Sequence, residues 1–269
     1  MPEIEVNGQQ VHWRETGEGP AVILLHPMLG HGGSFLPMAA HLPGYRLTMP
    51  DLPGHGHTGY DQARGEIQAQ AAEMVSAIMD EIGGPVHIVG HSFGGTVATR
   101  LAHEEPERVS SLTLIEPVWF GFLDDAGHPG GDIERAANRA FMDASLAQDW
   151  DAAVRAFMNR WGGPVPFSAM PAQMQHYISE RIYLIAESAA EVGMLAGPRL
   201  TLDTLGPLPE KLLLIDGETS PPAIHQILDV IAERRPQARR VRVAGAGHML
   251  PITHPKEVAA PLKALLDQA

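Results

Sequence analysis

Residues 86–102 read VHIVGHSFGGTVATRLA and place a serine between two glycines where one structural pattern gives way to another. The residues before Gly90 are mainly apolar β-formers, as in a buried strand, whereas those after Gly94 have the spacing of a helix. In such a G-x-S-x-G motif the glycines permit a sharp turn that exposes the serine hydroxyl. Free N–H groups at the helix start also favour developing negative charge. We therefore expect Ser92 to be a nucleophile; as a simple helix N-cap it would need no flanking glycines.

Short apolar runs that resemble buried strands recur along the chain and alternate with helical patterns. The strand-like runs are residues 21–26, 45–50, 85–91, 110–117, 211–216 and 239–244, and the helical patterns are 66–82, 94–106 and 221–236. Near-continuous apolar character suits strands that are buried on both faces of a parallel sheet. The alternation predicts an α/β fold. Residues 4–17 predict a hairpin that turns at Asn7-Gly8.

The region from about Trp119 to Gly206 departs from this alternation because it contains no good strand run. Its patterns are helical, over residues 133–147, 149–161 and 174–195. We interpret the region as a helical insertion between two core strands, with the core formed by residues 1–118 and 207–269 and a helical cap by 119–206. The alternative is that these helices merely cover the sheet.

Composition excludes several classes of function. The net charge is −13, which argues against binding to nucleic acid or to an anionic membrane surface, since both need clustered Lys and Arg. The chain has no cysteine, so disulfides, thiolate catalysis and cysteine-ligated zinc are excluded. The N-terminus is acidic and polar, unlike a signal peptide, and no apolar run approaches the ~18 residues of a membrane span. We expect a soluble, cytoplasmic protein, and the sequence leaves its oligomeric state open.

Four motifs, in order, resemble those of the α/β-hydrolase family. They are LLHPMLG (24–30), MPDLPGHGHTGYD (49–61), GHSFGG (90–95) and GAGHMLPITHP (245–255). In the second motif Thr58 stands where serine is usual in the family. The resemblance covers the core from end to end. It implies an α/β-hydrolase fold, that is, a mostly parallel doubly wound sheet with a helical cap insertion.

The expected general base is His248, which follows the last strand-like run and precedes the last helical pattern. A neutral imidazole is well suited to take the proton of Ser92 near pH 7 and to return it to a leaving group. The order of serine first and histidine last also fits this fold. His254 is the nearest rival, but it precedes a proline and is interpreted as a surface cap of the last helix.

The resemblance also implies an oxyanion hole made of two backbone N–H groups. One belongs to Phe93, the residue after the nucleophile. The other belongs to Met28, in a segment that is usually His-Gly-x in the family and is His26-Pro27-Met28 here. Proline lacks an N–H, but position 27 is not the expected donor. The alternative is that residues 26–33 are only a glycine-rich turn.

The acid of the expected triad is absent from its usual place. In most relatives an aspartate stands three positions after the glycine that follows the strand, and here that position is Ser220. Glu116 ends the preceding strand at the same edge of the sheet, where some α/β-hydrolases carry their acid. We predict that Glu116 orients His248. The alternatives are Glu218, an acid from the insertion, or no acid at all; Asp51 is interpreted as a structural turn residue.

These residues predict a cofactor-free serine hydrolase that cleaves a carboxylic ester or a related small acyl substrate. The alternatives are hydrolysis of a carbon–carbon bond in a diketone and a non-catalytic ligand-binding protein. The nucleophile is serine, whereas haloalkane and epoxide hydrolases of this fold use aspartate. Four histidines crowd the same loops (His26, His55, His57 and His91), but their spacing matches no metal motif, so no metal is expected. The methionine-rich insertion is expected to line an apolar pocket, although plain core packing is an equal alternative.

Overall fold

The computed structural model describes residues 1–268, in which eight strands form one sheet in the order β1-β2-β4-β3-β5-β6-β7-β8. The strands are β1 (Glu3–Val6), β2 (Gln9–Thr16), β3 (Ala21–Leu25), β4 (Arg46–Pro50), β5 (Val86–His91), β6 (Val109–Ile115), β7 (Leu212–Gly217) and β8 (Arg239–Val243). The pairs β1–β2 and β2–β4 are antiparallel, and the other neighbouring strands run parallel. The expected mostly parallel sheet is confirmed, with the predicted hairpin at one edge.

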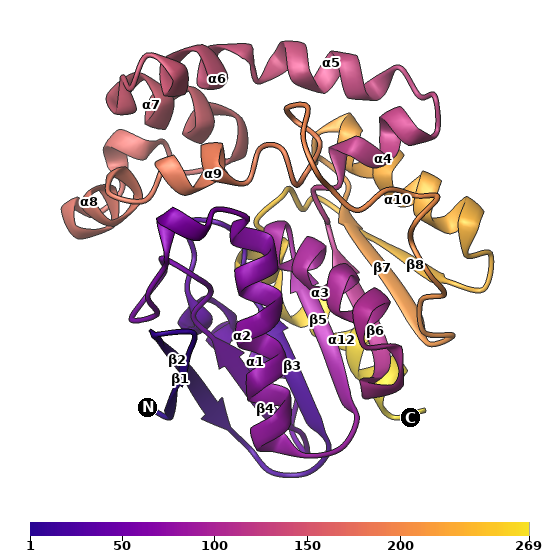
Figure 1. Cartoon of the computed structure of the whole chain (residues 1–269). Coiled ribbons are helices and arrows are strands. Elements are labelled where there is room, and N and C mark those ends of the chain that lie inside the picture. Colours follow the sequence, from indigo (N-terminus) through magenta and orange to yellow (C-terminus); the bar gives the residue numbers. More distant parts are fainter. Residues whose placement is uncertain (269) are drawn as a thin grey trace.

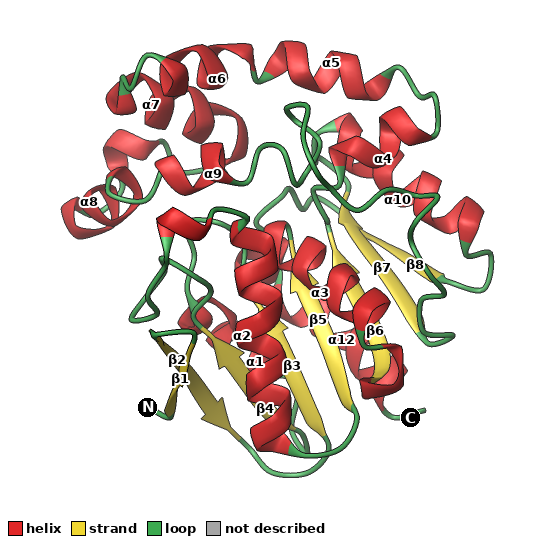
Figure 2. Cartoon of the chain, viewed as in Figure 1, coloured by secondary structure: helices red, strands yellow, loops and turns green. Residues whose placement is uncertain are grey.

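Helices cover both faces of this sheet (Figure 1; the helices are red in Figure 2). They are α1 (Leu36–Ala39), α2 (Ile67–Ile82), α3 (Phe93–Glu104), α4 (Phe120–Asp125), α5 (Gly130–Ala137), α6 (Arg139–Leu146), α7 (Trp150–Trp161), α8 (Ala172–Ser179), α9 (Tyr183–Glu187), α10 (Pro222–Arg234), α11 (Leu250–Thr253) and α12 (Pro255–Leu266). Side chains of α2, α3 and α10 belong to one hydrophobic core, and those of α1 and α12 belong to a second. The sheet is therefore doubly wound, as predicted.

The central strands are apolar because both of their faces are covered. Every residue of β5 and of β7 is buried. The edge strand β8 instead alternates arginine with valine, and most of its residues are partly exposed. At the opposite edge Asn7 and Gly8 both have positive φ, 50° and 79°, the geometry that a two-residue hairpin turn requires.

The carboxyl ends of β5, β6 and β8 meet at one edge of the sheet, and α4 to α9 lie above this edge in Figure 1. All of these helices belong to the connection between β6 and β7, where the sequence predicted an insertion. The expected helical pattern over 133–147 is divided in two at Asn138, which has a non-helical ψ of 5°. The side-chain amide of Asn138 donates back to the carbonyl and to the carboxylate of Glu134. These bonds accompany the end of α5 at Ala137.

No helix within residues 1–268 combines the length and the apolar character that crossing a membrane demands.

Candidate active site

Ser92 occupies a strained turn between β5 and α3. Its backbone has φ 56° and ψ −118°, a combination that residues with a Cβ rarely adopt. Its N–H donates to the carbonyl of Ile115 on β6 at 2.9 Å, which fixes the turn to the sheet. The flanking glycines are required by space: a Cβ at Gly90 would lie 2.2 Å from the Gly94 carbonyl, and one at Gly94 would lie 2.1 Å from the Leu25 carbonyl.

The structure brings Ser92, His248 and Glu116 together in one chain of hydrogen bonds. Nε2 of His248 lies 3.0 Å from Oγ of Ser92, and its Nδ1 lies 2.6 Å from Oε2 of Glu116. An ionised carboxylate only accepts hydrogen bonds, so Nδ1 carries the proton and Nε2 is free to accept from the serine hydroxyl. This is the tautomer that a general base requires.

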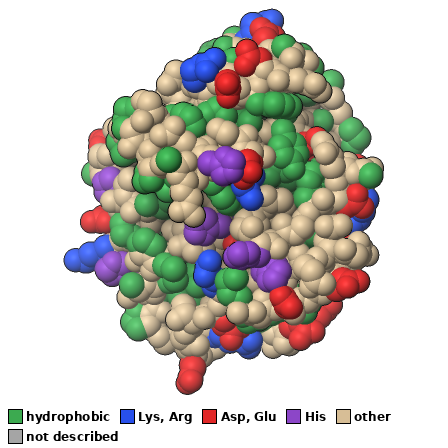
Figure 3. All heavy atoms as spheres, turned by 90° about the vertical axis from the view of Figure 1, so that its left-hand side faces the viewer, with side chains coloured by type: hydrophobic (Ala, Val, Ile, Leu, Met, Phe, Trp, Pro, Cys, Tyr) green, Lys and Arg blue, Asp and Glu red, His purple; other side chains and the backbone are tan. Residues whose placement is uncertain are grey.

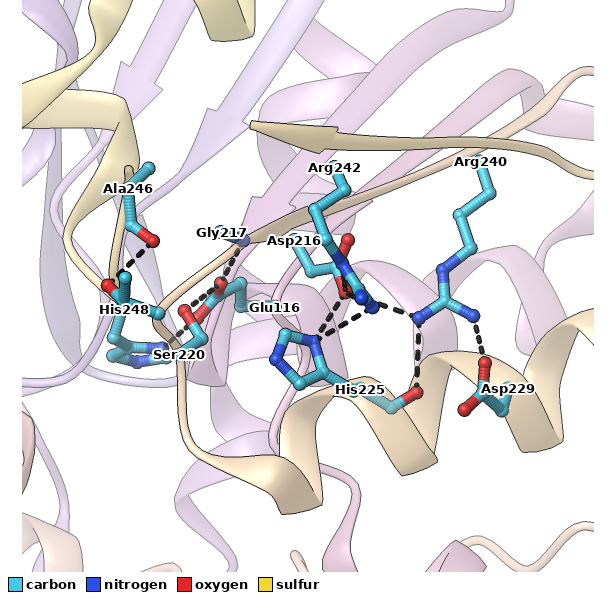
Figure 4. A network of polar contacts seen from close by, with 11 residues as sticks. Glu116, Asp216, Gly217, Ser220, His225, Asp229, Arg240, Arg242, Ala246 and His248 are labelled. Carbon is cyan, nitrogen blue, oxygen red and sulfur yellow. Dashed lines mark hydrogen bonds and ion pairs between the residues drawn. The ribbon is translucent and has the colours of Figure 1, made fainter. Parts of the chain in front are cut away.

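Glu116 is fully buried, and both of its oxygens have partners. Oε1 accepts from the N–H of Gly217 at 2.6 Å and from the hydroxyl of Ser220 at 2.5 Å, while Oε2 accepts from His248 (Figure 4). The backbone of Glu116 has a positive φ of 49°, and its N–H donates to the Ile215 carbonyl on β7. The carboxylate is thus held at one place by two strands and a loop.

The rival acids and bases lie elsewhere in hydrogen-bonded structural roles. Glu218 accepts from the N–H of Gly245, away from the ring of His248. Asp51 accepts from the N–H groups of Gly32 and His57 and thereby closes the turn that its motif predicted. His254 precedes the first residue of α12, where a cap was expected, and its Nδ1 contacts the hydroxyl of Thr253 rather than the backbone.

The expected oxyanion donors have N–H groups that remain free. In the loop after β3, Pro27 has no N–H, Gly30 donates to the Pro27 carbonyl, and Leu29 donates to Nε2 of His55. Among residues 1–268 the N–H groups of Met28 and Phe93 have no acceptor, and both residues line the cavity that holds Ser92. Two unpaired donors beside a serine hydroxyl at a helix start can stabilise an oxyanion.

Two buried histidines fix the loop that carries Met28. His26 donates from Nδ1 to the Pro27 carbonyl and accepts the N–H of Leu52 at Nε2. His55 does the same with the Pro53 carbonyl and the N–H of Leu29. Because each ring must accept at one nitrogen, both are neutral, and burial lowers the pKa of each to about 3. These bonds tie the loop after β3 to the loop after β4.

His91 serves a related purpose on the other side of Ser92. It is buried, and burial lowers its pKa well below the usual value. Its Nε2 donates at 2.7 Å to the backbone carbonyl of His248. The residue between the first glycine and the nucleophile therefore anchors the backbone of the proposed base. Three of the histidines that crowd these loops, His26, His55 and His91, bond to backbone carbonyls. Within residues 1–268 no group of three or more metal-ligating side chains is placed to hold an ion.

A small apolar cavity opens on Ser92 and His248. Its volume is about 70 Å³, and the remaining lining comes mainly from aromatic and aliphatic side chains of the helical segment. They include Phe120, Phe141, Met142, Phe157 and Trp161. We call this space the inner cavity. The described residues that line it include no lysine and no arginine.

A larger space of about 460 Å³, which we call the outer groove, adjoins the inner cavity and shares Met28, Phe157 and Trp161 with it. Five methionines line it: Met28, Met158, Met170, Met174 and Met249. Figure 3 shows one face of the molecule, on which hydrophobic side chains and several histidines are exposed, with charged side chains both beside these histidines and at the margins. The methionine-rich lining agrees with the expected apolar pocket.

Trp161 lines both of these spaces and contacts the proposed base. Its indole packs edge-on against the His248 ring with 4.8 Å between the ring centroids. The indole N–H donates to Oδ1 of Asn138 at 3.3 Å. Trp161 also borders a third, more polar groove that reaches Ser220 and His254. One side chain thus borders the reacting centre and all three openings around it.

Comparison with protein families gives one decisive match. Residues 20–255 match the model of the alpha/beta hydrolase fold family. The chain belongs to this family. The expectation that it is a hydrolase is therefore confirmed.

Relatives of this α/β-hydrolase include enzymes of two reaction types. A pimeloyl-[acyl-carrier protein] methyl ester esterase of Nitrosomonas europaea is 28% identical over 95% of this chain and 99% of its own length. A 2-hydroxy-6-oxo-6-phenylhexa-2,4-dienoate hydrolase of Comamonas testosteroni is 35% identical over 45% of this chain and 44% of its own. The chain spans about two fifths of the length of some other curated relatives that it matches.

Solved structures give the same fold. An esterase from Exiguobacterium antarcticum superposes with a TM-score of 0.74 at 17% identity, and the match covers 97% of both chains. At this identity the likeness supports the α/β-hydrolase fold alone.

Sequence reasoning missed several residues that shape the site. Ser220 was considered only as the place of an absent acid, and its bond to Glu116 was not expected. Trp161 carried no signal beyond a helical pattern, although it lies against His248. His91 occupies the first unspecified position of the G-x-S-x-G motif. The motif gives no reason to expect its bond to the backbone of His248.

Proposed function

We propose that this α/β-hydrolase cleaves carboxylic esters whose acyl group carries no charge, and that it does so through Ser92, His248 and Glu116. The observation that carries the proposal is the unbroken chain from the Ser92 hydroxyl through His248 to the buried Glu116 carboxylate, beside two free N–H groups. Esterases among the relatives support the reaction type. The site needs no cofactor for this chemistry.

In the proposed mechanism Oγ of Ser92 attacks the ester carbonyl carbon while its proton passes to Nε2 of His248. The carbonyl oxygen becomes an oxyanion that accepts from the N–H groups of Met28 and Phe93. The tetrahedral intermediate collapses, and His248 returns the proton to the departing alcohol. Water then attacks the acyl-enzyme by the same steps and releases the acid. Glu116 stabilises the imidazolium in each half-reaction.

The linings of the two apolar spaces support an uncharged substrate. Neither the inner cavity nor the outer groove has a lysine or arginine among its described lining residues. Arg160 of the helical segment borders the polar groove and is already paired with the buried carboxylate of Glu134. A substrate carboxylate in either space would lose hydration without gaining a lysine or arginine partner among these residues.

This lining also favours ester cleavage over the carbon–carbon alternative. The Comamonas relative acts on a dienoate, whose carboxylate would lack a cation in these spaces. The non-catalytic alternative is disfavoured because the orienting acid whose absence motivated it is supplied by Glu116.

We further propose that residues 119–206 form a cap on a core of residues 1–118 and 207–269. This segment supplies most of the inner cavity lining, so it would determine which acyl group fits. A cytoplasmic location and the absence of nucleic-acid partners rest on the lack of cysteine and on the net charge of −13.

The test is intact mass after incubation with a fluorophosphonate, which labels activated serines. We expect one adduct on the wild-type chain, none on Ser92→Ala and strongly slowed labelling of His248→Ala. The same preparations should show wild-type circular dichroism. A folded wild-type chain that takes up no adduct would contradict an activated Ser92.

A further inference from the structure

The last residue of β7 and the three residues after it connect the proposed acid to the loop that carries the proposed base. Gly217 donates its N–H to Oε1 of Glu116. Glu218 accepts the N–H of Gly245, in the loop that carries His248. Thr219 donates both its N–H and its hydroxyl to the Ala246 carbonyl, at 2.8 and 2.9 Å. Ser220 donates its hydroxyl to Glu116. Each of residues 217–220 thus bonds either to the side chain of Glu116 or to the loop that carries His248.

We propose that Ser220 is a positioning residue for the reaction, acting through Glu116. This inference rests on the proposed function, because it assigns Ser220 a role only if Glu116 is the orienting acid. Ser220 is 6% exposed, and its Oγ lies 2.5 Å from Oε1 of the fully buried carboxylate. Figure 4 shows its hydroxyl directed at Glu116 beside the ring of His248.

The two oxygens of Glu116 receive different partners, and this division is the physical basis of the role. Oε1 is occupied by the donors of Gly217 and Ser220, so only Oε2 is available to the imidazole. A buried carboxylate with a single donor on Oε1 can rotate about its terminal bond and lose its alignment with Nδ1. Hydrogen bonds to an ionised group are also stronger than neutral ones, and losing one in a buried site is costly. Ser220 therefore holds the charge of Glu116 in place.

The same geometry implies that the acid could stand at residue 220 in place of residue 116. Because Ser220 touches the carboxylate that touches His248, a carboxylate built on residue 220 would lie next to the same imidazole. Its length would suit an aspartate, which is one methylene shorter than the glutamate that reaches from β6. A chain without the acid at 116 should therefore recover turnover when residue 220 becomes acidic. A residue with a purely structural role would give no such recovery.

The experiment compares kcat and KM for a neutral short-chain ester in Ser220→Ala, Glu116→Gln and the double variant Glu116→Gln/Ser220→Asp. We expect Ser220→Ala to lower kcat by about 10- to 100-fold with KM unchanged, as for the loss of one charge-assisted hydrogen bond. Glu116→Gln should lose about 10³-fold or more, and the double variant should regain at least about tenfold over it.

Ser111→Ala is the matched control. Ser111 is buried on β6, the strand that ends before Glu116, and its hydroxyl contacts Nδ1 of His87. Its loss removes a buried hydroxyl of the same kind, and it should leave kcat unchanged.

The outcomes separate the two proposals. Wild-type kcat in Ser220→Ala beside an inactive Glu116→Gln would overturn the role of Ser220 and leave the triad standing. Full turnover in Glu116→Gln would overturn the triad and the role of Ser220 with it. If Ser220→Ala does not fold, the double variant decides. The inference is then overturned if the double variant is no faster than Glu116→Gln.

Discussion

Oε2 of Glu116 and Nδ1 of His248 lie 2.6 Å apart although 132 residues separate them in the chain. The contact joins the end of β6 to the loop after β8, across the intervening end of β7. It places a buried negative charge against the nitrogen that must stay protonated while the other nitrogen accepts the serine proton. In the proposed mechanism Glu116 therefore supplies the acid, although residue 220, where the family resemblance implies an acid, is a serine.

Replacing Glu116 by glutamine should lower kcat by about 10³- to 10⁴-fold, because the amide no longer holds the imidazole in its basic tautomer. Glu218→Gln is the control: within residues 1–268 its carboxylate accepts a hydrogen bond from the N–H of Gly245 alone, so its loss should cost far less. Steady-state kinetics on one ester measure both variants. A larger loss for Glu218→Gln would move the acid to residue 218.

Methyl hexanoate should be a much better substrate than monomethyl adipate, whose acyl chain has the same number of carbons but ends in a carboxylate. The inner cavity and outer groove offer that carboxylate no lysine or arginine among their described lining residues. Burying an unpaired charge costs several kcal/mol, so kcat/KM should differ by at least about tenfold. Equal values would show that the substrate's far end stays in water or meets a cation.

Trp161→Ala should change chain-length preference. The indole lines both the inner cavity and the outer groove, so its removal joins the two spaces. We expect kcat/KM for a long acyl ester to rise relative to that for an acetate ester. A buried aromatic ring lost to alanine also costs about 3–5 kcal/mol of stability, so the milder Trp161→Phe accompanies it. An unchanged ratio in both folded variants would contradict a partition at this residue.

The free energy of unfolding should fall as the pH is lowered from about 6.5. Burial lowers the pKa of His26 and of His55 to about 3 in the folded chain. The unfolded chain binds protons at these residues near pH 6.5, so it holds more protons than the folded chain between about pH 6.5 and 3. Each histidine then lowers stability by about 1.4 kcal/mol per pH unit in that window.

Urea unfolding at pH 7, 6 and 5 measures this dependence, and His55→Gln should reduce its slope by about one proton. Stability that stays constant from pH 7 to pH 5 would mean that these rings are already protonated or exposed.

Much of this arrangement was predictable because it depends on short-range patterns. The strand ending at His91, the turn at Ser92 and the helix after it are encoded by consecutive residues, and the position of Glu116 follows from the parallel order of neighbouring strands. The sequence therefore predicted the three residues that the structure brings together. It also predicted that the N–H of Met28, after Pro27 in the loop that follows β3, is available to an oxyanion, and that N–H has no acceptor within residues 1–268.

The remaining features depend on side-chain contacts between distant segments. Trp161 contacts His248 only because α7 lies over the carboxyl edge of the sheet, and no local sequence pattern specifies that placement. The break at Asn138 arises from side-chain bonds to Glu134 and Trp161 that compete with the helix. The bond from Ser220 requires the exact height at which β7 ends relative to β6, which sequence spacing does not encode.

The edge-on packing of Trp161 against His248 gives the site an optical signal of its own. Indole emission depends on the polarity and the water around the ring, and this ring borders the inner cavity, the outer groove and the polar groove. The chain has four tryptophans, so subtracting the spectrum of Trp161→Phe isolates this one. Ligand entry, acyl-enzyme formation and product release can then be followed in real time on unlabelled protein, with substrates that carry no chromophore.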